Sequence, residues 1–148
     1  NMYVLYLFGG IVEKHLQDAH GLVIGSAIYL FMYVAAAVAA TMPSFVKHKD
    51  NVYYSAIGAS GAVSAIVFAS IIIYPLIDLR LFFIPIDIPG FIFGSLYLLF
   101  ESVMNKRGRT NIAHDAHIAG AVFGIVFILI TNFELLPRFL KQVSSFFV

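Results

Sequence analysis

Apolar residues fall into five segments along the chain, separated by polar breaks. The segments cover about residues 1–12, 21–41, 51–74, 90–103 and 111–133. Charged runs such as Lys47-His48-Lys49-Asp50 stand between them, and residues 21–40 and 51–77 contain no Asp, Glu, Lys, Arg or His. A helix of about 20 apolar residues crosses the hydrocarbon core of a membrane. The pattern therefore predicts a bundle of membrane-spanning helices.

Composition favours the same class of protein. Of the 148 residues, 61% are hydrophobic and 11% are charged. Soluble domains carry about a quarter charged residues, so this chain lacks the polar surface to face water on all sides. The net charge of +1 does not indicate a nucleic-acid partner, and the absence of cysteine excludes thiolate catalysis. We predict an all-α, polytopic membrane helical bundle that forms one domain over residues 1–148.

Two regions are predicted to lie outside the bundle. Asp78, Pro85, Asp87 and Pro89 belong to a kinked connector before the fourth segment, which extends upstream if residues 81–88 are helical. The tail after residue 137 carries both basic and aromatic residues, an arrangement that suits the membrane surface.

Ser60 and His117 stand out because both lie in apolar sequence. Ser60 follows Gly58 and precedes Gly61. Glycine is unfavourable inside a helix and suits turns or close packing, so a helix starting near Ser60 would begin below the membrane surface. Residues 51–58 would then descend as a loop, which requires protein or a water-filled cavity beside them. We therefore expect water next to Ser60.

A serine hydroxyl needs a neighbouring base to act as a nucleophile, and an imidazole suits that role near neutral pH. The first N–H groups of a helix that begins at Ser60 could bind a developing oxyanion. A carboxylate to complete a triad is hard to find. Asp115 lies two residues from His117, about 200° around a helix, and so faces away. We predict a two-residue dyad of Ser60 and His117.

Three motifs stand in a recognisable order: Gly58-Ala59-Ser60-Gly61, then Ala116-His117-Ile118-Ala119-Gly120 followed by Gly124, and, near the start, Gly9-Gly10-Ile11-Val12-Glu13-Lys14. They resemble the GxSG, AHxxGxxxG and GGxxE patterns of the rhomboid intramembrane serine proteases. The resemblance covers nearly the whole chain. It implies a six-helix core with five of the six helices present, and cleavage of transmembrane substrates with Ser60 as nucleophile and His117 as base.

The same resemblance carries further expectations. Asn1 would supply an oxyanion-hole side chain beside the backbone N–H of Ser60, while the partner histidine, the first helix and the start of the second would lie outside this chain. The chain then looks like a fragment, inactive alone. Many family members have tyrosine at the position of Ser64, stacking on the catalytic histidine. The expected partners are transmembrane proteins and the lipid bilayer, with no cofactor, in a bacterial inner (plasma) membrane.

Other interpretations of these residues stay open. Small residues four apart favour close helix packing, and we expect Gly58, Gly61, Gly120 and Gly124 to serve that purpose. His114 and His117 could bind a metal, but no third ligand is evident and catalytic zinc uses three, so no metal is predicted.

Two other functions are possible. The first is a catalytically inactive rhomboid-like protein that binds membrane clients. The second is part of a transporter, with His117 on a proton path. Of the remaining polar residues, His15, His20 and His48 are expected to be solvated in loops. Glu13 is expected to bond loop backbone.

Overall fold

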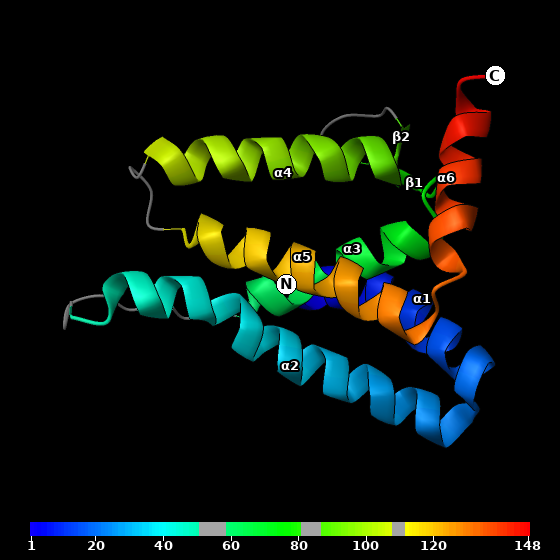
Figure 1. Ribbon diagram of the computed structural model, residues 1–148, viewed down its shortest axis with the longest axis horizontal. Helices are drawn as coiled ribbons and strands as arrows, with labels where there is room; N and C mark the ends of the chain where they lie inside the picture. Colours follow the sequence, from blue (N-terminus) through cyan, green and yellow to red (C-terminus); the bar gives the residue numbers. More distant parts are fainter. Residues whose placement is uncertain (51–58, 81–86, 108–111) are drawn as a thin grey trace.

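The computed structural model describes residues 1–50, 59–80, 87–107 and 112–148. Within these ranges the chain forms six helices and two short strands, in the order α1 (Met2–His20), α2 (Leu22–His48), α3 (Ser60–Ile73), β1 (Asp78–Arg80), β2 (Asp87–Pro89), α4 (Gly90–Arg107), α5 (His114–Thr131) and α6 (Leu135–Phe146). In Figure 1, α2, α4 and α5 run along the length of the molecule and α6 crosses at one end. The predicted class, an all-α membrane helical bundle, is confirmed.

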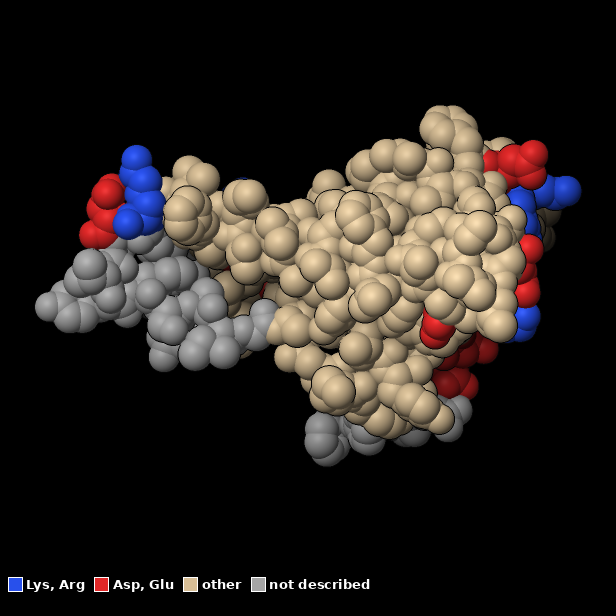
Figure 2. All heavy atoms as spheres, turned by 90° about the horizontal axis from the view of Figure 1, so that it is seen from below, with Lys and Arg blue, Asp and Glu red and all other residues tan. Residues whose placement is uncertain are grey.

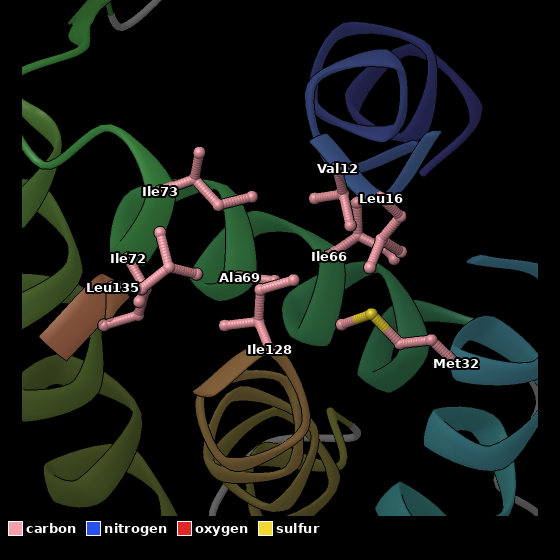
Figure 3. Packing of buried hydrophobic residues seen from close by; sticks show 9 residues of the cluster. All are labelled: Val12, Leu16, Met32, Ile66, Ala69, Ile72, Ile73, Ile128 and Leu135. Atoms are coloured by element: carbon pink, nitrogen blue, oxygen red, sulfur yellow. The ribbon is translucent and has the colours of Figure 1, made fainter. Parts of the chain in front are cut away.

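The centre of the bundle is α3. Every residue of this helix after Ser60 is buried, and the helix contacts α1, α2, α4, α5 and α6. Figure 3 shows apolar side chains of α1, α2, α5 and α6 meeting those of α3, namely Val12, Leu16, Met32, Ile66, Ala69, Ile72, Ile73, Ile128 and Leu135. A helix that is apolar all round is one surrounded by other elements. Ser60, at the start of this helix, is therefore held on a rigid support.

The surface of the bundle is also apolar. Two of the described helices, α2 over Leu22–Lys47 and α5, are long and apolar enough to cross a membrane, while α3 is shorter. On the face in Figure 2, Lys, Arg, Asp and Glu side chains gather mainly towards the two ends, with a broad uncharged region between them. Such a surface suits contact with lipid, where helices satisfy their own backbone hydrogen bonds.

Helix α1 continues to His20, beyond the predicted end of the first segment at residue 12, and its second half contacts α2. The carboxylate of Glu13 accepts a hydrogen bond from the Ser26 hydroxyl at 2.8 Å, and Gln17 donates to the same hydroxyl at 2.8 Å. The prediction that Glu13 bonds loop backbone was therefore wrong. The two helices meet at Gly21, whose φ of 85° lies in the left-handed region that glycine adopts without strain. This turn lets α1 and α2 pack as a hairpin.

All three histidines expected in loops belong to helices, and His48 is the last residue of α2. His15 lies half-buried within α1, and its Nε2 has no hydrogen-bond partner among the described residues. His20 is the exposed last residue of the same helix. The side chain of His48 lies outside the described part of the chain.

The connector before α4 contains a small antiparallel ribbon. Strands β1 and β2 pair with Leu79 opposite Ile88. The possible helix over residues 81–88 is wrong at residues 87 and 88, which belong to β2. Residues 81–86 lie outside the described ranges. The predicted loop at 51–58 also lies outside them. The amide of Gly90 donates to the carbonyl of Ile77 at 2.8 Å, which fixes the start of α4 next to the end of α3.

Candidate active site

Ser60 is the first residue of α3. The first bond of the helical ladder runs from the Val63 amide to the Ala59 carbonyl at 2.9 Å. The amides of Ser60 and Gly61 thus come before the ladder begins, and such N–H groups point outward from a helix start. Of the neighbouring glycines, Gly58 lies outside the described residues.

Close packing of two backbones brings α5 beside Ser60. A Cβ atom added to Gly120 would overlap the carbonyl oxygen of Gly61, and one added to Gly124 would overlap the carbonyl oxygen of Ala65. Small residues at this spacing allow membrane helices to approach closely. Gly61, Gly120 and Gly124 lie at or beside these contacts, and close packing stays their predicted role. Because Gly120 lies one turn after His117, the same contact sets the imidazole opposite Ser60.

Ser60 and His117 form a direct hydrogen bond. The distance between His117 Nε2 and Ser60 Oγ is 2.9 Å. With Nε2 as the acceptor, the hydroxyl points its proton at a base, which is the arrangement of an activated nucleophile. Asp115 points elsewhere, as the helical spacing predicted: it accepts hydrogen bonds from the Ser44 hydroxyl at 2.7 Å and the Ala116 amide at 2.9 Å.

A carboxylate that sequence reasoning missed contacts the other side of the imidazole. Glu101 Oε1 lies 3.0 Å from His117 Nδ1, and Glu101 Oε2 lies 2.5 Å from His114 Nδ1. The predicted two-residue dyad is therefore incomplete as a description of the contacts. Glu101 is the one acidic residue of the fourth apolar segment, and an ionisable residue inside such a segment is by default functional. That signal could have identified it.

An aromatic ring also lies beside the imidazole. The ring centroids of Tyr97 and His117 are 6.4 Å apart with planes at 31°. The Tyr97 hydroxyl lies 3.3 Å from Ser64 Oγ, so the serine at the position where a tyrosine was expected contacts a tyrosine from another helix. Tyr97 precedes Glu101 by four residues and therefore lies on the same face of α4. One face of α4 thus carries both contacts to His117.

The serine and histidine open onto a cavity of about 530 Å³. Its polar lining includes Asn1, Ser60, Ser64, Tyr97 and His117. Most of the remaining lining is apolar and comes from α1, α3 and α4. Asn1, the expected oxyanion-hole residue, therefore shares one cavity with Ser60. A concave site with few polar groups among apolar ones is the usual form of a ligand pocket.

The same cluster contains enough ligands for a metal ion. Among the described residues, one ligand atom each from Glu101, His114 and His117 lie within 4.8 Å of one another. Glu101 supplies the third ligand that was not evident from the sequence, so the reason for excluding a metal does not hold. The Nδ1 atoms of both histidines hydrogen-bond to Glu101. A metal ion bound through these atoms would replace the hydrogen bond that holds His117.

Comparison with known proteins relates most of the chain to one family. The family model named Rhomboid domain matches residues 1–132. RHOMBOID-like protein 12, mitochondrial, from Arabidopsis thaliana is 32% identical over 139 residues, which cover 85% of this chain and 39% of that protein. The chain thus spans about two fifths of the length of that relative. No solved structure matches the chain.

Proposed function

Because the chain belongs to the rhomboid family, we propose that it is the core of an intramembrane serine endopeptidase that hydrolyses peptide bonds of transmembrane proteins. The proposal rests on the 2.9 Å contact between Ser60 Oγ and His117 Nε2 at an open cavity. In this reaction the Ser60 oxygen attacks the carbonyl carbon of the substrate while His117 takes the hydroxyl proton. His117 then gives that proton to the leaving amine, and water hydrolyses the acyl-enzyme.

The negative charge that develops on the substrate oxygen requires hydrogen-bond donors. The Ser60 amide at the start of α3 is one candidate. The Asn1 side chain, on the same cavity, is a second. Donors of this kind stabilise the transition state because they are already in place before the charge appears.

The rest of the cavity suits an apolar substrate segment. Val4, Phe8 and Phe93 are among the residues that line it, next to Ser60. Membrane location follows from the family and from the apolar helices. The expected bacterial inner membrane has no support, since the relative's name places that protein in mitochondria.

Reconstitution of the full-length protein with a single-span substrate tests the proposal. The substrate carries a different tag at each end, and we expect two fragments whose junction, mapped by mass spectrometry, lies in or beside the membrane span. Vesicles without the protein serve as the control. If the folded protein binds the substrate and leaves it intact, the proposal is wrong and the client-binding function takes its place.

Metal removal is expected to leave the cleavage rate unchanged. In the proposed mechanism His117 acts as a base through Nε2, and Glu101 contacts Nδ1, so no step uses a metal ion. Initial rates before and after treatment with EDTA, followed by addition of zinc, measure this. A loss of activity on chelation that zinc restores would favour a metal site formed by Glu101, His114 and His117.

The ring of Tyr97 is expected to matter more than its hydroxyl. Tyr97→Ala removes the aromatic contact with His117 and is expected to lower the cleavage rate about fivefold, because such contacts contribute about 1 kcal/mol. Tyr97→Phe keeps the ring and loses the hydroxyl contacts with Ser64 and Glu101, so its rate stays within about threefold of wild type. Initial rates and melting temperatures of both variants check this. Equal rates for the two variants would contradict a role of the ring.

A further inference from the structure

We propose that Glu101 is a positioning residue for the Ser60–His117 pair, and that His114 holds Glu101 in place. This inference rests on the proposed proteolytic function. The predicted dyad then becomes part of a row of four side chains that joins α4 to α5 and α3. The row runs from His114 through Glu101 and His117 to Ser60.

The burial of Glu101 argues for a specific role. Its side chain is 5% exposed, and that of His114 is 4% exposed. A buried carboxylate is costly unless hydrogen bonds and opposite charge compensate it. Here each oxygen has its own imidazole, since Oε2 faces His114 and Oε1 faces His117. A carboxylate that only joined α4 to α5 would require a hydrogen bond to His114 and none to His117.

The contact with Glu101 selects the tautomer of His117. A neutral imidazole has one N–H, and an ionised carboxylate can only accept a hydrogen bond. The proton of neutral His117 must therefore be on Nδ1, which leaves the lone pair of Nε2 facing the Ser60 hydroxyl. This is the form that a general base requires. When His117 takes the serine proton, the negative charge of Glu101 also stabilises the imidazolium that forms.

His114 fixes Glu101 from the opposite side. His114 and His117 are three residues apart on α5, so their side chains lie on one face of the helix. Both present Nδ1 to the same carboxylate. The carboxylate therefore cannot rotate away from His117 without losing its bond to His114. The other nearby acid, Asp115, is bound to Ser44 and the Ala116 amide and does not take part.

The test compares the full-length wild type with Glu101→Gln, and with Glu134→Gln as a matched control. Glu134 is exposed before α6, so its variant is expected to behave as wild type. Glutamine keeps the size of Glu101 and removes its charge, so KM for the single-span substrate is expected to stay near wild type. The expected fall in kcat is about 10²-fold or more, because the corresponding change in the Ser-His-Asp template lowers kcat about 10⁴-fold.

A second measurement reads the tautomer directly. Nitrogen-15 NMR of histidine-labelled protein in micelles is expected to show the His117 proton on Nδ1 in wild type and a shift towards Nε2 in Glu101→Gln. A proton on Nε2 in the wild type overturns the inference, whether or not the variant folds. So does a kcat for Glu101→Gln within twofold of wild type. A wild type that binds and never cleaves the substrate would instead overturn the proposed function, while the NMR result still reports on Glu101.

Discussion

Ser60→Ala is expected to lower the cleavage of a single-span substrate by at least about 10³-fold. The change removes the oxygen that attacks the peptide bond, and loss of the nucleophile in serine proteases costs about 10⁶ in kcat. The fold should be unaffected, because a half-buried hydroxyl at the start of α3 is replaced by a hydrogen atom. Tagged substrate and product bands, followed over time in vesicles, measure the rate.

Ser70→Ala is the matched control for this experiment. Ser70 lies on the same helix and is fully buried, and its hydroxyl donates to the Val67 carbonyl at 2.7 Å, away from His117. Its variant should cleave at a rate close to wild type. If Ser60→Ala keeps more than a tenth of the wild-type rate, another group is the nucleophile.

The second large effect concerns the fold. Gly120→Ala is expected to destabilise the bundle by about 3 kcal/mol or more, near the upper end of the cost of overpacking a core. The new methyl group would overlap the Gly61 carbonyl oxygen, which is backbone and cannot rotate away. Relief requires α5 to separate from α3, and this movement would also part His117 from Ser60. Activity and stability should therefore fall together.

Gly10→Ala is the control for that substitution. Gly10 is exposed on α1, and an added Cβ atom would meet no heavy atom of the described structure within 4 Å. Alanine also has a higher helix propensity than glycine, by about 1 kcal/mol. Thermal unfolding in detergent micelles should show an unchanged or raised melting temperature for Gly10→Ala and a clear fall for Gly120→Ala. Similar melting of Gly120→Ala and wild type would mean that the two helices are not in backbone contact.

The sequence predicted what depends on local pattern. The described parts of the five apolar segments are mainly helical. Two of these helices, α2 and α5, have the length and hydrophobicity of a membrane span. The orientation of Asp115 away from His117 also followed from the helical period. The exact extent of α1 did not follow from the helical period. Glu13 and Gln17 lie in the continued helix and contact Ser26, which is thirteen residues after Glu13 and nine after Gln17.

The site was predicted only in part, because some of its contacts depend on how distant segments pack. Ser60 and His117 could be paired because a serine nucleophile needs a base and because both residues lie in motifs of one family. The contact of Glu101 with His117 depends on how α4 packs on α5, sixteen residues away along the chain, and no local rule fixes that packing. Tyr97 is a similar case. Its ring faces His117 from a different helix than the one on which the family pattern suggested a tyrosine.

The central claim is that His117 activates the Ser60 hydroxyl. Labelling of the full-length protein with a serine-reactive fluorophosphonate probe tests it most directly, because the probe reacts only with an activated serine and needs no substrate. Mass spectrometry should find the adduct on the peptide that contains Ser60 in the wild type, and no adduct there in His117→Ala. Absence of the adduct from the folded wild type, or an adduct of equal yield in His117→Ala, would contradict the account.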